Sequence, residues 1–464
     1  MAFISPDTIR KNFSIAMSDM FRQEVPAYGM LVDMVEQINS QTLADDAKLQ
    51  VSLESTDGVE RITEERHGAI RLGTEEELFN MRRLFAVMGM SPVSYYDLSV
   101  ASIPVHATAF RPVERAALAV NPFRVFTSLL RLDLIKDEKL REDAKEILST
   151  RQIFTARVLE LIAQAERDGG LNEADSAEFV SEALETFRWH SKARLDQGLF
   201  ERLLQAHRLI ADVVSFNGPH INHLTPRTLD IDAVQVEMPN RGIDPKAIVE
   251  GPPARKCPVL LRQTSFKALN EPVFFKDGED GWVAGHHTAR FGEIEQRGAA
   301  LTPKGRELYD TLLNDVRGQI RPDGNGSNSE EYMAVLTEVF AAFPDDWAEI
   351  RTQELAYFQY YLTEAGLVEI GNNAGRDLDA LIADGLVGYA PVVYEDFLPV
   401  SAAGIFQSNL GDDQGEEFVF NPNQEMFEKA LGAAVLNEFD HYATMEANSI
   451  EAILAQFNAV TAAE

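Results

Sequence analysis

The sequence feature that most constrains the fold is a stretch of helical character, residues about 135–215, that separates two groups of strand-like segments. Within it, Leu, Ile and Phe recur every three or four residues among charged residues, as on the buried face of a helix. The flanking segments are strand-like, which predicts β-structure. The predicted strands are 68–72, 93–100, 105–111 and 123–132 before it, and 234–238, 259–266, 273–275, 286–297, 387–400 and 418–420 after it. We therefore expect an α+β fold with a helical insertion.

Helix signals lie outside the insertion as well. Residues about 7–40 have apolar side chains at helical spacing until Pro26 interrupts them. Thr74 followed by three glutamates is typical of a capped helix start. Further helices are predicted at about 303–318, 330–342 and 350–365, with two more at the C-terminal end.

The charge balance narrows the class of partner. The chain has 42 Lys and Arg against 74 Asp and Glu, a net charge of −32. Such a surface repels nucleic-acid phosphates and anionic membranes, so neither is expected as a partner. The basic residues are 12 Lys and 30 Arg, and arginine suits bidentate binding of carboxylates. An anionic small molecule, held in a local basic pocket, is the expected ligand.

Cysteine content and the N-terminal residues bear on the compartment. The chain has one cysteine, Cys257, which suits a reducing cytoplasm, and its apolar setting predicts a buried small side chain rather than a nucleophile. The N-terminal residues lack a basic region followed by an apolar core, and no long uncharged apolar stretch occurs. We expect a cytoplasmic protein.

Common signature motifs are missing from the sequence. It has no phosphate-binding loop, no dinucleotide-binding glycine motif, no H-E-x-x-H and no G-x-S-x-G. One cysteine also excludes thiolate metal sites and iron–sulfur clusters within one chain. The candidate chemistry therefore rests on histidine and carboxylate residues, which gather in three segments, 64–74, 216–227 and 285–298.

The first segment contains His67 and Arg71 within a predicted strand. Four residues apart, they project from the same face of an extended chain, where they could hold a metal and a carboxylate side by side. A solvated polar face would give the same pattern.

The second segment is a turn-rich loop that presents His220 and His223. Two histidines between prolines can ligate a metal, but either can also cap or pack. In the third segment, period two predicts one face with His287, Glu293 and Glu295 and another with His286. An exposed salt-bridged surface is the alternative for this strand.

Two histidines and one carboxylate from separate strands would form a facial ligand set. Imidazole and carboxylate suit Fe(II), and three protein ligands leave three positions for a bidentate substrate and O₂. Zinc accepts the same ligands, usually with one open position. Both metals stay open on residue types alone.

These segments resemble the 2-oxoadipate dioxygenase/decarboxylase family of the vicinal-oxygen-chelate superfamily. The resemblance covers nearly the whole chain, and four motifs carry it in the right order. They are Arg66-His-Gly-Ala-Ile-Arg71, His220-Ile-Asn-His223-Leu-Thr-Pro-Arg227, Arg290-Phe-Gly-Glu293-Ile-Glu-Gln-Arg-Gly298 and Tyr394-Glu-Asp-Phe-Leu-Pro-Val400-Ser401-Ala-Ala-Gly-Ile-Phe406. Four separated motifs form a far more specific signal than any one of them.

The resemblance implies a role for each candidate residue. His67, His223 and Glu293 would hold Fe(II), and His67 would also lie against the substrate. Arg71 would bind a substrate carboxylate and act in catalysis, and Val400 and Ser401 would line the pocket near the substrate's other end.

Two choices among these residues also follow from resemblance. The strand Phe291–Arg297 is similar to the metal strand of 4-hydroxyphenylpyruvate dioxygenase, which favours Glu293 as ligand and leaves Glu295 a supporting role. The family pattern likewise favours His223 over His220. The roles of His220, His286 and His287 stay open.

The resemblance also implies the architecture. We expect residues 1–464 to form a single large catalytic unit around a central, incompletely closed β-barrel of the vicinal-oxygen-chelate type, with helices outside. Residues 135–215 would be the helical insertion, and the strand-rich parts 216–300 and 385–422 would complete the core around the metal.

The implied reaction joins 2-oxoadipate and O₂ to give (R)-2-hydroxyglutarate and CO₂, a step of lysine breakdown. The 2-oxo acid would chelate Fe(II) through its carboxylate and keto oxygens. The alternatives are a related metalloenzyme acting on another 2-oxo acid and a metal-binding protein without turnover. The sequence does not indicate an oligomeric state.

Overall fold

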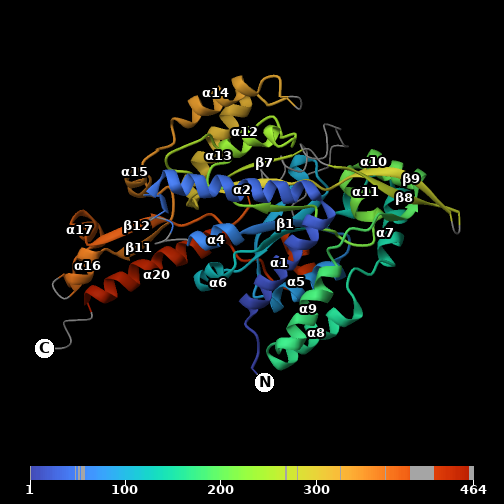
Figure 1. The fold of residues 1–464 in the computed structure, drawn as a ribbon, viewed down its shortest axis with the longest axis horizontal. Helices are drawn as coiled ribbons and strands as arrows, with labels where there is room; N and C mark the ends of the chain where they lie inside the picture. Colours follow the sequence, from blue (N-terminus) through green and yellow to red (C-terminus); the bar gives the residue numbers. More distant parts are fainter. Residues whose placement is uncertain are drawn as a thin grey trace. The chain divides into compact units, whose positions relative to one another are not determined.

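The computed structural model describes residues 2–458, apart from residues 48, 51–52, 54–57, 267–268, 279–280, 324–325, 371–372 and 398–422, and apart from the side chains of residues 100 and 101. The chain divides into two compact units (Figure 1). Unit 1 comprises residues 1–250, 263–296 and 396–436, and unit 2 comprises residues 251–262, 297–395 and 437–464.

Unit 1 is built on a five-stranded sheet in the order β2-β3-β4-β1-β6. Its strands are β1 (Arg66–Leu72), β2 (Ser91–Asp97), β3 (Val105–Arg111), β4 (Arg124–Leu130) and β6 (His223–Pro226). β1 pairs in parallel with β4 and antiparallel with β6, while β2 with β3 and β3 with β4 are antiparallel. β1 therefore has a neighbour on each side, and each of its residues is buried.

A smaller sheet in unit 1 has the order β5-β8-β9, with β5 (Lys192–Asp196), β8 (Asn270–Asp277) and β9 (Gly281–Thr288). The helices of unit 1 are α1 (Pro6–Glu24), α2 (Pro26–Asp45), α4 (Val59–Glu64), α5 (Glu75–Val87), α6 (Arg115–Val120), α7 (Glu138–Ser149), α8 (Ala156–Asp168), α9 (Glu173–Glu185), α10 (Gln197–Ala206), α11 (Arg208–Ser215), α12 (Ile231–Asn240) and α19 (Gln424–Leu431). Short 3-10 helices occupy Leu98–Ala101 and Leu132–Leu134. Figure 1 shows α10 and α11 beside β8 and β9, and the Phe200 and Phe275 rings join them at 4.6 Å.

Unit 2 contains α13 (Pro303–Gln319), α14 (Ser329–Phe340), α15 (Trp347–Thr352), α16 (Glu364–Val368), α17 (Leu378–Ala383) and α20 (Glu438–Asn458). Its antiparallel pair is β11 (Phe358–Leu362) with β12 (Val387–Pro391). The boundary between the units falls within β7 (Leu261–Ser265) and within β10 (Glu293–Arg297), which form a two-stranded sheet.

The two faces of β1 bury different side chains because alternate residues of a strand point in opposite directions. Ile70 and Leu72 pack in an apolar cluster with residues of α1, α2 and α5. Ala69 packs in a second cluster that includes Phe126 and Phe397. The odd-numbered residues of β1, from His67 to Arg71, therefore face that second side.

Several predicted elements are confirmed with small shifts at their ends. The helix after Thr74 is α5, and the Thr74 hydroxyl accepts a hydrogen bond from the Glu77 amide. The 105–111 strand is β3. The mixed α+β class is confirmed, whereas closure of the strands into an incomplete barrel stays a prediction. Among the described residues, no helix has the length and apolar character needed to span a bilayer.

Three element predictions were wrong. Residues 234–238 lie in helix α12, which begins after Asp230, whose carboxylate accepts from the Ala233 amide. Residues 350–365 contain the end of α15 and then β11, with Glu354 at a φ of 55° between them. Residues 286–297 form the end of β9 and then β10, so the predicted common face for His287 and Glu293 does not exist.

Candidate metal centre

The sheet of unit 1 brings two of the candidate ligands to neighbouring strands. On β1, His67 lies opposite Thr225 of β6, and Ala69 lies opposite His223. On the other side of β1, His67 lies opposite Arg124 of β4. Gly68 lies between His67 and Ala69 on β1. A Cβ atom at this position would be 2.5 Å from Ile221 Cδ1, which is too close. The local sequence therefore permits the close packing that places both imidazoles together.

His67, His223 and Glu293 form a buried group of possible metal ligands. One ligand atom from each lies within 4.8 Å of the other two. His67 Nε2 is 3.1 Å and His223 Nδ1 is 3.7 Å from Glu293 Oε1. All three residues are at most 3% exposed. Two imidazoles and one carboxylate at this spacing form a donor set that can hold a divalent metal such as Fe(II).

The electrostatics of this group favour a cation. Burial raises the pKa of Glu293, and the nearby His67 only partly offsets this effect. Burial and the neighbouring His67 hold the pKa of His223 well below its usual range, which keeps its imidazole neutral. Glu293 Oε2 accepts no hydrogen bond from any residue that the structure describes. A buried carboxylate oxygen without a donor is costly, and a metal ion would remove that cost, so the residues fit the metal.

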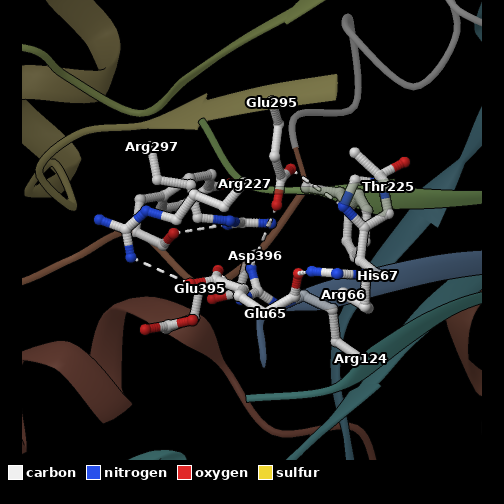
Figure 2. A network of polar contacts seen from close by, with 12 residues as sticks. Glu65, Arg66, His67, Arg124, Thr225, Arg227, Glu295, Arg297, Glu395 and Asp396 are labelled. Carbon is white, nitrogen blue, oxygen red and sulfur yellow. Dashed lines mark hydrogen bonds and ion pairs between the residues drawn. The ribbon is translucent and has the colours of Figure 1, made fainter. Parts of the chain in front are cut away.

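The other nitrogen of His67 faces a second carboxylate. His67 Nδ1 is 3.0 Å from Glu295 Oε2, and Arg124 Nη1 is 3.8 Å from Glu295 Oε1. Arg124 also donates to Glu65, and Arg227 Nη1 is 3.0 Å from Glu65 Oε2. We call the five buried residues His67, Glu295, Arg124, Glu65 and Arg227 the Glu295 network, which Figure 2 shows from close by.

The Glu295 network determines how His67 can bind a metal. Burial by itself lowers the pKa of His67, but Glu295 and Glu293 outweigh it, so the pKa is raised. The negative charge of Glu295 beside Nδ1 favours a proton on that nitrogen, which would leave the Nε2 lone pair for a metal. Nε2 is also the nitrogen that faces Glu293. The arrangement is the carboxylate–histidine pair common behind metal ligands.

Aromatic and polar side chains enclose the ligands. The Phe397 ring lies edge-on to His67 at 4.9 Å, and the Phe291 ring stacks on His223 at 4.8 Å. Gln263 Nε2 donates to Glu293 Oε1 at 3.1 Å, and the Thr225 hydroxyl donates to the same oxygen at 3.3 Å. The two phenylalanine rings limit access of water, and Gln263 and Thr225 hold the carboxylate of Glu293 in place.

Arg71 lies on the same face of β1 in a second buried group. Its Nη1 donates to Asp212 Oδ2 of α11 at 2.7 Å. The other carboxylate oxygen, Asp212 Oδ1, is 2.8 Å from His287 Nε2 and 3.4 Å from His220 Nε2. We call these four residues the Asp212 cluster. They are at most 5% exposed.

The structure assigns places to most of the predicted site residues. His67, His223 and Glu293 come together, and Arg71 follows His67 on β1. Val400 and Ser401 lie outside the described residues, so their predicted part in the pocket stays a prediction.

The histidines and the glutamate left open by the sequence also have defined places. His220 and His287 contact Asp212 instead of Glu293, and His286 is exposed on β9. Glu295 contacts His67 from the side opposite Glu293.

Sequence reasoning missed the residues that support the candidate ligands. Asp212 is the clearest case, because it is the one charged residue of the apolar run Leu209–Val214 and the whole run is buried. A carboxylate at such a position needs a partner, and this signal could have identified it. Glu65, Arg124 and Gln263 have no comparable signal, since polar residues at strand ends are common.

The fold and the site together define an α+β protein with a candidate mononuclear metal centre of two histidines and one carboxylate. The 2-oxoadipate dioxygenase/decarboxylase family profile matches residues 13–409. The chain belongs to this family.

Individual relatives agree with the family. A Pseudomonas putida protein named 2-oxoadipate dioxygenase/decarboxylase is 58% identical over 458 residues, covering 98% of each chain. An Escherichia coli protein of the same name is 54% identical over 449 residues, covering 96% of this chain and 98% of that one. The crystal structure of the Pseudomonas putida hydroxyglutarate synthase in complex with 2-oxoadipate is similar, with a TM-score of 0.91, 57% identity and coverage of 98% and 99%.

Proposed function

We propose that this protein is an Fe(II)-dependent 2-oxoadipate dioxygenase/decarboxylase that converts 2-oxoadipate and O₂ to (R)-2-hydroxyglutarate and CO₂ in lysine catabolism. The observation that carries the proposal is the buried group of His67, His223 and Glu293 with Arg71 on the same strand face. The complex of a 57% identical hydroxyglutarate synthase with 2-oxoadipate supports the choice of substrate.

The overall reaction balances without a second organic substrate. 2-Oxoadipic acid, C₆H₈O₅, and O₂ give 2-hydroxyglutaric acid, C₅H₈O₅, and CO₂. The bond between the carboxyl and keto carbons breaks, the keto carbon becomes a carboxylate, and the carbon beside it gains a hydroxyl group. One atom of O₂ enters each new group. Oxidative cleavage of the carbon–carbon bond supplies two electrons and hydroxylation of the neighbouring carbon supplies two, which together are the four electrons that O₂ accepts.

In this proposal His67, His223 and Glu293 hold Fe(II). The iron, when bound, would supply Lewis-acid binding of the 2-oxo acid and the electrons that activate O₂. Glu295 holds the proton of His67 on Nδ1, so that Nε2 is available as a ligand. Gln263 and Thr225 hold the Glu293 carboxylate in place through hydrogen bonds.

Arg71 provides orientation in the proposed mechanism. Its guanidinium would form charge-assisted hydrogen bonds with a carboxylate of the substrate. Fixing that carboxylate limits which carbon–hydrogen bond faces the reacting oxygen, which is where positioning gains most of its effect. Phe397 and Phe291 pack on the two imidazoles and exclude water from this side of the centre.

We also propose that the strands around the centre belong to an incompletely closed barrel of the vicinal-oxygen-chelate type. The support is the arrangement of β1, β4 and β6, whose residues surround His67. An experimental structure that includes residues 398–422 would test it by the pairing of the remaining strands.

The activity test uses the full chain, loaded with Fe(II) under anaerobic conditions and then mixed with 2-oxoadipate and O₂. We expect equal consumption of O₂ and 2-oxoadipate, equal release of CO₂, and (R)-2-hydroxyglutarate that carries both atoms of ¹⁸O₂. A panel of other 2-oxo acids of different lengths serves as the comparison. No O₂ uptake with 2-oxoadipate would contradict the proposal, and faster uptake with another member of the panel would change the substrate.

A further inference from the structure

The Asp212 cluster contains a carboxylate that contacts Arg71, and the proposed reaction gives this carboxylate no role so far. Asp212 lies on α11, where residues Leu209–Ser215 are all buried. Its side chain is 4% exposed. A buried carboxylate at the end of a substrate-binding side chain must affect that side chain, because charges in a protein interior are weakly screened.

The two oxygens of Asp212 have separate partners. Oδ2 accepts from Arg71 Nη1 at 2.7 Å, whereas Oδ1 faces His287 Nε2 at 2.8 Å and His220 Nε2 at 3.4 Å. His287 Nε2 forms a hydrogen bond with Oδ1, whereas His220 Nε2 accepts from the side-chain amide of Asn222 at 3.2 Å and lies beside the carboxylate. The His287 contact therefore holds one oxygen of the carboxylate, and the carboxylate in turn fixes the direction of one guanidinium nitrogen. A planar guanidinium with one nitrogen fixed has little freedom left.

The imidazoles are themselves held by aromatic rings. Trp189 lies edge-on to His220 at 4.7 Å, and Phe216 packs on His287 at 4.9 Å. The Phe200 ring contacts His287 from another side at 5.7 Å. The cluster is therefore anchored in the apolar part of unit 1 and does not depend on solvent.

The charges of the cluster match this arrangement. Burial by itself favours the neutral carboxyl group of Asp212, but His220, His287 and Arg71 together hold its pKa well below the usual range. Burial lowers the pKa of His220, although Asp212 opposes this effect. The ionised pair of Arg71 and Asp212 thus lies beside two imidazoles, and His287 supplies a hydrogen bond to it. Separating a buried pair of this kind costs more than the pair gains by forming.

We propose that Asp212 is a positioning residue that orients the Arg71 guanidinium toward a carboxylate of the substrate, and that His287 holds Asp212 for this purpose. The inference rests on the proposed function, since it takes Arg71 as the group that binds the substrate. It assigns α11, the last helix before the His220–His223 segment, to substrate recognition rather than to metal binding.

A double-mutant cycle on the Fe(II)-loaded enzyme tests the inference, with Asp212→Asn, Arg71→Met and the combination. Asp212→Asn should raise the KM for 2-oxoadipate by about tenfold to hundredfold, because a misplaced positioning group costs this much. Fe(II) content should change less than twofold. The double variant should be no worse than Arg71→Met, because residues that act through one another are not additive.

A second variant guards against misfolding of the first. His287→Phe keeps an aromatic ring in an aromatic setting but removes the group facing Asp212 Oδ1. We expect a smaller rise in KM, in the same direction and again with unchanged iron content. Asp196→Ala is the control: it removes the carboxylate that caps α10 in the same unit, and it should leave KM unchanged.

The outcomes separate the inference from the proposed function. A wild-type KM in Asp212→Asn, or multiplicative effects in the double variant, would overturn the positioning role. Equal loss of iron and of substrate use would overturn it too, since that result means a structural effect. Absence of turnover by the wild-type enzyme would overturn the proposed function. If the wild-type enzyme shows no turnover, the affinity of the same variants for 2-oxoadipate is measured by calorimetry on the Zn(II)-loaded proteins. No binding by the Zn(II)-loaded wild type would overturn both the positioning role and the proposed function.

Discussion

Strand β1 contributes to two buried polar groups, and the two groups have opposite arrangements of charge. Around His67, one imidazole lies between two carboxylates, Glu293 and Glu295. Around Asp212, one carboxylate lies between a guanidinium and two imidazoles. Both groups start from the same face of one strand, four residues apart, and both are almost fully buried.

The difference between them explains what each can bind. In the first group, two carboxylates lie on the two sides of one imidazole, which is a setting that a metal cation would stabilise. In the second group, Arg71 and Asp212 balance each other, and His287 adds a hydrogen bond. This balance of charge stabilises the second group in the absence of a ligand, and it holds the Arg71 guanidinium in a fixed position in which it could bind an anion. A protein with net charge −32 can thus hold a dianionic substrate through local charges.

The largest expected effect comes from breaking the first group. Glu293→Ala removes the carboxylate that joins both imidazoles, so Fe(II) affinity should collapse and turnover should fall at least about a thousandfold. Metal analysis after dialysis, together with O₂ uptake, measures both. The matched control is Glu237→Ala, which removes a half-buried glutamate of α12 that pairs with Arg241. Normal iron content in Glu293→Ala would rule out its role as a ligand.

A change at Arg71 should break the second group and leave the first intact. Arg71→Met should lower kcat/KM for 2-oxoadipate by about tenfold to 150-fold, which corresponds to about 1.5–3 kcal/mol for charge-assisted hydrogen bonds. Iron affinity should stay within about twofold, because Arg71 contacts Asp212 and not the ligand carboxylate. Steady-state kinetics and iron titration give the two numbers, and equal losses in both would contradict the division into two groups.

Glu295→Gln tests whether the first group extends beyond its ligands. Glutamine keeps the shape but removes the charge that faces His67 Nδ1, so iron affinity should fall by about tenfold to hundredfold. Competition with a chelator measures the affinity, and the visible spectrum of the Co(II)-loaded protein reports the ligand field independently of turnover. Unchanged affinity and an unchanged spectrum would show that the Arg124 and Glu65 contacts have a structural purpose alone.

A smaller effect, on the stability of the whole protein, is expected from the buried imidazole of His106, which lies near the guanidinium of Arg131. Burial and then Arg131 lower the pKa of His106 to about 3, so it stays neutral in the folded protein while the unfolded chain takes up a proton near pH 6.5. The free energy of unfolding should therefore fall as the pH drops, by about 2 kcal/mol between pH 6.5 and pH 5. Denaturant unfolding of the wild type and of His106→Gln at both pH values measures it. The same pH effect in both proteins would exclude His106 as its source.

Local spacing could single out candidate residues, the choice of His67, His223 and Glu293 as ligands came from the family resemblance, and neither identified the residues that support them. His67 and Arg71 were found because a strand places residues four apart on one face, and this local rule needs no tertiary information. The same rule failed for residues 286–297, where a break between β9 and β10 ends the alternation. Contacts such as Arg71 with Asp212 join residues 141 positions apart, and no local pattern specifies which helix supplies the carboxylate.

The wide spacing of the candidate ligands has a consequence for how the protein is made. His67 and Glu293 meet across 226 positions, so the chain must close a very long loop before both can bind one ion. During synthesis, a nascent chain that has not reached residue 293 carries two imidazoles without their carboxylate. A metal ion bound by these three residues therefore could not guide the early folding of this chain. Its uptake would instead mark a protein in which the first, middle and later parts of unit 1 have already come together.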